Sequence, residues 1–289
     1  MSAPSPGQGT WTPSPAQRER AAAARRMRRR STLLSTGSAL VFFGILAVVV
    51  VTSPGWPTVR ATFFDWSAAV DALPDVLEGF WLNVRLFLIA EPLILVLGLA
   101  VAAARVSSSP LLLPVRLVAI GYTDLFRGLP TILVVFLICF GIPTLQLQGV
   151  TNSLFWLALV ALVLSYGAYV AEVFRAGIES VHPSQVASAT ALGLSHRQSL
   201  RHVVVPQAVR RVTPPLLNDF ISLQKDTALV AAVGLADALG TASDTANYTF
   251  NFTPYVVAAA LFVGLTVPLA RFTDWAGRRA MARERAGVR

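Results

Sequence analysis

Polar and charged side chains inside long apolar stretches are the first candidates for chemistry in this sequence. Glu91 lies near the middle of one such stretch, and Asn218, Asp219, Gln224 and Lys225 lie in another. A charge at the centre of a bilayer costs roughly 2.5–3.5 kcal/mol, so such residues are functional candidates by default. We expect these five residues to line a path for a polar solute, with structural bracing of helices as an equal alternative.

Other kinds of chemistry are disfavoured by the residues present. His182, His196 and His202 have only Glu179 nearby, so we expect no metal site. A phosphate-binding Walker loop needs Gly-Lys-Ser/Thr, and the single lysine, Lys225, follows a glutamine and precedes an aspartate. No nucleophile and base are combined inside an apolar stretch, so we expect neither an enzyme nor a resident cofactor.

The composition explains why these polar residues stand in apolar surroundings. Of 289 residues, 54% are hydrophobic and only 13% are charged, whereas soluble domains carry about 25% charge. This composition disfavours both a soluble enzyme and a disordered chain. The single cysteine, Cys139, lies in an apolar run, which excludes an internal disulfide and favours a buried side chain.

Apolar stretches of about 20 residues, enough for a helix to cross a bilayer, recur along the chain. The first could be a signal peptide, but no convincing cleavage site follows, so we favour a retained helix. The predicted fold is all-α, with six transmembrane helices near 33–51, 79–104, 118–143, 153–174, 214–235 and 255–271.

Arginine is concentrated in every second segment between these stretches, and the net charge is +9. Cytoplasmic segments of membrane proteins are enriched in Arg and Lys, so we expect both termini in the cytoplasm. This bias also removes the need for a nucleic-acid partner. The predicted divisions are a disordered basic cytoplasmic tail (1–32), an extra helix with an external segment (33–78), a five-span core (79–271) containing a cytoplasmic loop (175–213), and a cytoplasmic tail (272–289).

Two pairs of opposite charge stand three residues apart near predicted cytoplasmic helix ends. Asp124 precedes Arg127 in this way, and Glu172 precedes Arg175. We expect both to be structural ion pairs, because residues three apart share one face of a helix. Arg85 lies nearer the outer end of its span, where its side chain can extend to the interface.

The cytoplasmic loop predicts two short helices joined by a turn. His182 and Pro183 start the first helix, Gly193 suits the left-handed residue that ends it, and Ser195 forms a capping box with Gln198. We expect Pro206 to end the second helix. Such a loop is a docking surface or, alternatively, an amphipathic elbow on the membrane. Its candidate docking residues are Ser184, Gln185, Ala187, Ser188, Ala189, Gly193, Ser195 and Pro206.

The same loop carries a family resemblance. The run Ala187-Ser188-Ala189, followed by Gly193 and Val203-x-Val205-Pro206, resembles the signature loop of ABC importer permeases. Ala187 replaces the signature glutamate of that family, and Ser188 replaces its first alanine. The chain is more narrowly similar to the polar amino-acid permeases of histidine, glutamine and glutamate uptake. Three blocks carry this similarity: 122–130, 167–177, and 206–229 with its Pro214-Pro215 and Lys225-Asp226 steps.

The resemblance implies a type I ABC importer permease in the bacterial cytoplasmic membrane. It implies import of polar amino acids by alternating access, driven by separate ATPase subunits that bind ATP and dock on the cytoplasmic loop. An external solute-binding protein and a second permease, identical or related, complete the implied assembly. Import of another small polar solute, an intramembrane enzyme and a lone channel are the alternatives.

Overall fold

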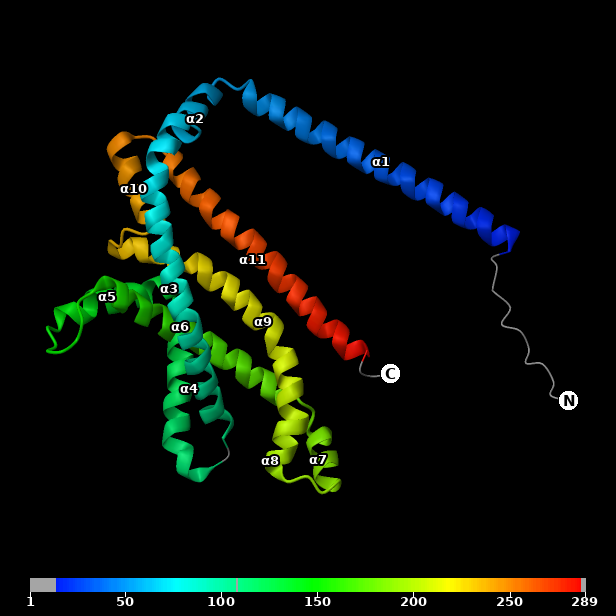
Figure 1. Ribbon diagram of the computed structural model, residues 1–289, viewed down its shortest axis with the longest axis vertical. Helices are drawn as coiled ribbons and strands as arrows, with labels where there is room; N and C mark the ends of the chain where they lie inside the picture. The colour runs from blue at the N-terminus through cyan, green and yellow to red at the C-terminus, as the bar shows by residue number, and fades with distance from the viewer. Residues whose placement is uncertain (1–13, 108, 287–289) are drawn as a thin grey trace. The chain divides into compact units, whose positions relative to one another are not determined.

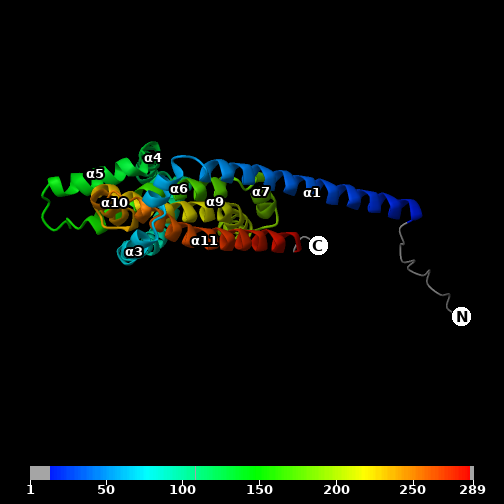
Figure 2. The same ribbon diagram turned by 90° about the horizontal axis from the view of Figure 1, so that it is seen from above.

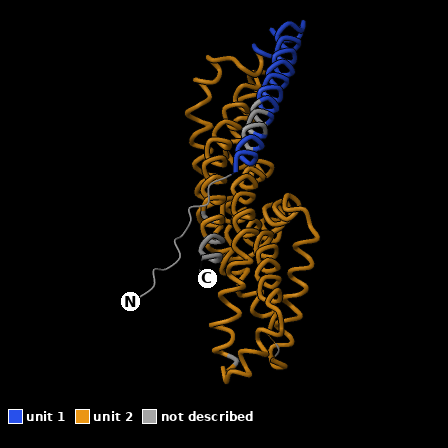
Figure 3. The backbone as a smooth tube through the Cα atoms, turned by 90° about the vertical axis from the view of Figure 1, so that its right-hand side faces the viewer, with its two compact units in different colours: residues 1–60 blue, residues 61–289 orange. Residues whose placement is uncertain are grey.

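The computed structural model describes the backbone of residues 14–107 and 109–286, and no strand occurs among them (Figure 1). The chain divides into two compact units, residues 1–60 and 61–289 (Figure 3). The bounds of the α-helices are α1 Pro15–Val51, α2 Trp56–Phe63, α3 Trp66–Val106, α4 Leu113–Gly128, α5 Thr131–Thr144, α6 Leu154–Glu179, α7 Pro183–Ala191, α8 His196–Ser199, α9 Val205–Asp226, α10 Ala238–Thr249 and α11 Thr253–Ala286. Three short helices of other types are η1 Pro110–Leu112, η2 Leu200–Val204 and η3 Thr227–Val233.

Unit 1 consists mainly of α1, which is longer than the predicted first span. Ser14 and Gln17 form a capping box, and Pro15 occupies the first turn. The prediction of a disordered tail was therefore wrong for residues 15–32, where Ala, Arg, Gln and Glu are good helix formers behind a strong cap. Residues 1–13 lie outside the described part. The apolar half, Arg30–Val51, is exposed on every side, as a lipid-facing span would be.

Unit 2 is built around α3 and α6. Gly98 of α3 allows this close packing, because a Cβ there would lie 2.5 Å from Val170 Cγ1 of α6. Leu86, Ile94 and Leu162 belong to one buried apolar cluster between these helices. A second cluster joins the first half of α3 to α10 and α11, and α11 also runs along α9 (Figures 1 and 2).

The predicted third span, 118–143, is two helices that meet at an angle of 106°. α4 ends at Gly128, and Leu129 is extended, with φ −101° and ψ 138°. The cause is local: a residue before proline avoids helical backbone angles, and Pro130 precedes the first residue of α5.

The described helices support four membrane crossings by length and composition, or five if α4 and α5 form one. The apolar windows lie in Arg30–Val51, Trp56–Val106, Leu154–Glu179 and Thr253–Arg279. The predicted fifth span, 214–235, is formed by the second half of α9 and by η3, which is capped by Gly234 with φ +88°. α9 is too polar to qualify as a crossing on composition alone.

Two predicted boundaries differ from the structure. The division at 78/79 falls inside α3, which is continuous from Trp66, and the compact core starts instead at Ala61. The predicted end of the last span at 271 falls inside α11, which continues to Ala286. In both places the helix extends beyond the apolar stretch. Hydrophobicity indicates only which residues can lie in lipid, whereas backbone hydrogen bonds determine where a helix ends.

Candidate functional site

The connection between α6 and α9 contains the predicted helix–glycine–helix loop. The His182 Nδ1 atom accepts a hydrogen bond from the Ser184 backbone N–H at 3.2 Å and caps α7. Gly193 has φ +83°, and its N–H donates to the carbonyl of Thr190, while the next N–H donates to the carbonyl of Ala189. This pair of bonds is a Schellman motif, and it confirms the predicted glycine turn.

The second helix of the loop begins as predicted but does not end where predicted. The Gln198 backbone N–H donates to Ser195 Oγ at 3.3 Å, and the Ser195 N–H donates to Gln198 Oε1 at 2.8 Å, which confirms the capping box. Pro206 does not stop the helix: α8 continues through the π-helix η2 into α9. The Val205 N–H donates to the Leu200 carbonyl five residues back, one residue further than in an α-helix, so the hydrogen-bond register shifts by one residue. Pro206 then falls in the first turn of α9, where no N–H is required.

Side chains from α9 fasten this loop to the helices of the core. Arg211 donates to the carbonyl of Ser180 at the end of α6, and Gln207 donates to the side chain of Gln185 on α7. A Cβ on Gly177 would collide with the Val212 side chain, so α6 and α9 touch directly below the loop. α7 is therefore hydrogen-bonded to α9, which in turn packs against α6.

The predicted docking residues are not equally accessible. Ala189 is 4% exposed and packs inward, whereas Ser184, Gln185, Ala187 and Ser188 are exposed on α7. Leu192, at the tip of the loop, is 83% exposed and was not among the sequence candidates. The available signal was a large apolar residue directly before the turn glycine. The exposed candidates, Leu192 included, are Ser184, Gln185, Ala187, Ser188, Leu192, Gly193, Ser195 and Pro206.

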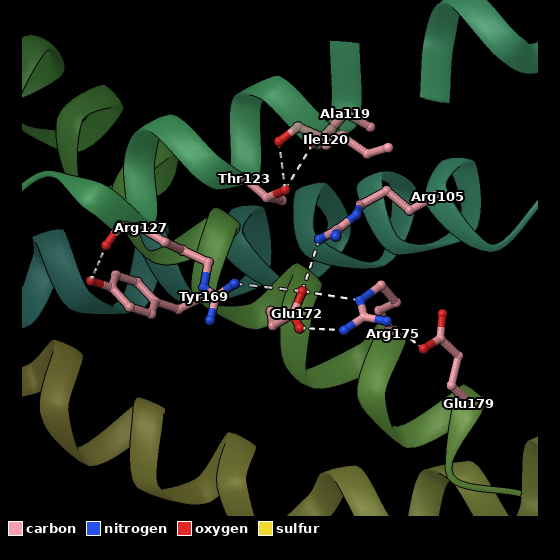
Figure 4. A network of polar contacts seen from close by, with 9 residues as sticks. All are labelled: Arg105, Ala119, Ile120, Thr123, Arg127, Tyr169, Glu172, Arg175 and Glu179. Carbon is pink, nitrogen blue, oxygen red and sulfur yellow. Dashed lines mark hydrogen bonds and ion pairs between the residues drawn. The ribbon is translucent and has the colours of Figure 1, made fainter. Parts of the chain in front are cut away.

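A cluster of ionic side chains joins the ends of α3, α4 and α6 (Figure 4). Glu172 of α6 accepts hydrogen bonds from Arg105 at 2.8 Å and from Arg175, and Arg127 lies 3.7 Å away. The predicted pair of Glu172 with Arg175 is confirmed. The predicted pair of Asp124 with Arg127 is wrong, because Arg127 reaches toward Glu172, and Asp124 is exposed and forms no ion pair within the described residues.

The five polar residues proposed for a solute path occupy different environments. Gln224 is 2% exposed, and its Oε1 accepts a hydrogen bond from Thr266 at 2.6 Å, so it braces α9 against α11. Asn218 and Lys225 are exposed and lie seven residues apart, on one face of α9.

The two acidic candidates, Glu91 and Asp219, lie on α3 and α9, which are in contact nearby through the Phe87 and Phe220 rings, 4.7 Å between centres. Both acidic residues are partly buried, and their carboxyl groups interact electrostatically. Asp219 Oδ2 is buried and has no hydrogen-bond partner among the described residues. Next to them, the Tyr166 hydroxyl donates to Asp226 Oδ2 at 2.7 Å. The structure thus brings acidic side chains from helices far apart in the sequence to one place in the core.

Comparisons with known proteins agree with these features. The family described as "Binding-protein-dependent transport system inner membrane component" matches residues 94–281. The arginine transport system permease protein ArtQ of Bacillus subtilis (strain 168) is 31% identical over 217 residues, covering 75% of this chain and 97% of ArtQ. The glutamate/aspartate import permease protein GltK of Escherichia coli O157:H7 is 35% identical over 185 residues, covering 62% of this chain and 81% of GltK.

Solved structures show the same fold. A chain of the "amino acid ABC transporter with histidines" superimposes with a TM-score of 0.67 at 31% identity, covering 74% of this chain and 98% of that one. A chain of the MetNI methionine ABC transporter in an inward facing conformation gives a TM-score of 0.56 at 19% identity. The aligned portions leave about a quarter of the present chain unmatched in both.

Proposed function

Because the chain belongs to the family of binding-protein-dependent transport system inner membrane components, we propose that it carries polar amino acids across the bacterial cytoplasmic membrane. It is a permease subunit of an amino-acid ABC transporter, a multi-pass membrane protein and not an enzyme. ATP hydrolysis belongs to a separate ATPase subunit, and a substrate-binding protein supplies the solute. In this proposal ATP is bound by the partner, and no cofactor is held by the chain itself.

The observation that carries the proposal is the exposed loop formed by α7, Gly193 and α8. Its outer surface offers small side chains and one apolar tip, Leu192, which suit insertion into a groove of a partner. Through Arg211 and Gln207, the loop is tied to the core helices. We assign this surface to the ATPase subunit. When two ATPase subunits close around ATP, they would move α6 and α9 together and open the solute path to one side of the membrane while closing it to the other.

A matched pair of glycine substitutions tests this assignment. Gly193 and Gly149 have φ +83° and +80°, and neither has an atom within 4 Å of a would-be Cβ. Glutamate at either position therefore carries the same backbone strain, about 1–2 kcal/mol. Only Gly193→Glu should lower uptake in proteoliposomes, by at least about tenfold, while Gly149→Glu stays within about twofold of wild type. Normal uptake by a membrane-inserted Gly193→Glu protein would overturn the docking assignment.

We further propose six crossings with both termini in the cytoplasm. α9 with η3 is then the crossing that hydropathy misses, since its polar residues would face other helices, a path or a second permease rather than lipid. The bent pair of α4 and α5 supplies another. A homodimer, or a dimer with a related permease, would pair two such polar faces across the path.

The path itself is assigned to Glu91, Asn218, Asp219 and Lys225. A carboxylate facing lipid would have to be protonated or drag in water, so the position of Glu91 against α9 is the less costly arrangement. The exposed face of α9 adds an amide and an ammonium. Together these groups offer both signs of charge to a solute that carries an ammonium and a carboxylate. Gln224, bound to Thr266, is assigned a bracing role beside the path.

A further inference from the structure

A polar hollow lies between α3 and the residues that lead into α10. α10 stands at the end of the core opposite α7 and α8 (Figure 1). The volume of the hollow is about 430 Å³, within the range of ~300–1,000 Å³ that small-molecule sites occupy. The residues around it that matter for binding are Asp75, Glu78, Leu82 and Arg85 of α3, with Ala236 and Thr241 opposite. It is separate from the loop that faces the ATPase subunit and from the cluster around Glu91.

Opposite charges face this hollow without neutralising each other. Asp75, Glu78 and Arg85 fall on one face of α3, since they stand three and seven residues apart. None of the three forms an ion pair with any described residue of the chain. Glu78 and Arg85 stand seven residues apart, which corresponds to about 10 Å along the helix. Both side chains are long enough to contact one small ligand bound between them.

The guanidinium of Arg85 lies beside an aromatic ring. Its Cζ atom lies 6.0 Å from the centre of the Phe155 ring, at the start of α6. An arginine against an aromatic ring keeps its N–H groups available for a carboxylate, which it can bind through two parallel hydrogen bonds. The ring thus orients the cation without consuming its hydrogen-bonding capacity.

The wall opposite α3 is fixed by buried contacts. The Asn83 amide donates to Asp237 Oδ2 at 2.8 Å, and Asn83 Oδ1 accepts from the Ala238 N–H at 3.1 Å. A Cβ on Gly79 would lie 2.5 Å from the Asp237 carbonyl carbon, so no larger residue permits this approach. The hollow is therefore preformed, which reduces the entropy that binding must overcome.

The hollow also lies at a functional depth. Arg85 precedes Arg105 by 20 residues, which correspond to about 30 Å of helix and match the thickness of the hydrocarbon core. If Arg105 marks the cytoplasmic boundary, as the topology proposed above requires, Arg85 stands at the outer boundary. A solute released outside the membrane reaches this hollow before it reaches Glu91.

We propose that this hollow is an outer binding site for the backbone of a free α-amino acid, with Arg85 binding the α-carboxylate and Glu78, assisted by Asp75, binding the α-ammonium. Leu82, Ala236 and Thr241 leave the amino-acid side chain without a charged partner, so the site recognises the zwitterion common to all α-amino acids. The site rests on the proposed function and deepens it: it receives substrate from the binding protein before the path opens.

The test measures recognition of the α-carboxylate. The complex of permease and ATPase subunits is placed in nanodiscs without binding protein or nucleotide, and L-glutamine is compared with L-glutaminamide, which keeps the ammonium but lacks the carboxylate. Wild type should prefer L-glutamine by at least about tenfold. Arg85→Gln should abolish this preference, Arg85→Lys should retain part of it, and Arg60→Gln, a matched exposed arginine, should retain all of it.

Other outcomes would overturn the outer site. If wild type shows no preference, or if Arg85→Gln keeps it, Arg85 does not bind the carboxylate, and a lipid phosphate or solvent is its partner instead. The same preparations are assayed for uptake and ATP hydrolysis with loaded binding protein. Intact coupled uptake without a carboxylate preference would refute the outer site alone, whereas failure of the ATPase subunit to co-purify would refute the proposed function.

Discussion

Replacement of Glu172 by glutamine should loosen the junction of α3, α4 and α6. Glu172 is 22% exposed and Arg105 is 14% exposed, so their hydrogen bond at 2.8 Å is shielded from water. Arg175 donates a second hydrogen bond to Glu172. The Arg127 guanidinium, with a nitrogen 3.7 Å from Glu172 Oε2, adds an electrostatic attraction. Charge-assisted hydrogen bonds contribute about 1.5–3 kcal/mol each. Because glutamine can still accept one of them, we expect Glu172→Gln to cost about 2–3 kcal/mol of stability.

Glu179 provides a matched control on the same helix. Among the residues that the structure describes, its side chain bonds only to Arg175, and it is 53% exposed, so Glu179→Gln should cost about 0.5 kcal/mol, as exposed pairs do. The assay is the thermal midpoint of the detergent-purified protein, followed by size-exclusion of the folded fraction. At about 2–4 °C for each kcal/mol, the thermal midpoint of Glu172→Gln should fall below that of Glu179→Gln by roughly 3–10 °C.

Removing the partner of Glu172 as well should partly restore stability. If the main cost is the buried charge that Arg105 retains without the Glu172 carboxylate, the double variant Arg105→Gln with Glu172→Gln should be more stable than Glu172→Gln alone. Equal midpoints for Glu172→Gln and Glu179→Gln would refute the central role of Glu172. A double variant that is no more stable than the single one would refute the cost assigned to Arg105.

Three further outcomes are expected. Asn83→Leu should lose about 3–5 kcal/mol, because it leaves the buried carboxylate at the start of α10 without its amide partner; an unchanged yield of folded protein after extraction would contradict this. Glu91→Gln should insert normally but weaken substrate-stimulated ATP hydrolysis, and full uptake by Glu91→Leu with unchanged substrate preference would remove Glu91 from the path. On a Cys139→Ala background, an impermeant thiol reagent should label Tyr248→Cys from outside and Leu192→Cys only after the membrane is opened, since both positions are more than four-fifths exposed; outside labelling at 192 would overturn the topology.

Features that depend on a few neighbouring residues were predictable from the sequence. The glycine turn at Gly193 and the capping box of Ser195 are formed by hydrogen bonds between residues at most five apart, so the residue types alone predict them. The apolar stretch 33–51 lies inside α1, and 153–174 begins at the N-cap of α6 and otherwise lies inside it, for a similar reason: a lipid-crossing helix must be apolar along its own length.

Some local signals were present but had competing interpretations. Gly128 and Pro130 stand inside an apolar run, and hydropathy alone continues the span where the backbone bends by 106°. Proline usually ends a helix because it has no backbone N–H to donate. After the π turn of η2, Pro206 falls in the first turn of α9, where no N–H is required. The same residue ends one helix or begins another according to the hydrogen bonds around it.

The sequence by itself thus determined the membrane class, the glycine turn and capping box of the α7–α8 loop, and the family resemblance, because composition, short-range hydrogen bonding and motif spacing are properties of contiguous residues. Only the tertiary structure decided that Arg105 meets Glu172 from 67 residues away, that Asn83 holds Asp237 across 154 residues, and that Gln224 braces a helix. Such contacts depend on how α3, α6, α9 and α11 pack. The two residues of each contact lie far apart along the chain. Several polar or charged residues could serve as the partner of each, and only the packing of the helices determines which of them comes within reach.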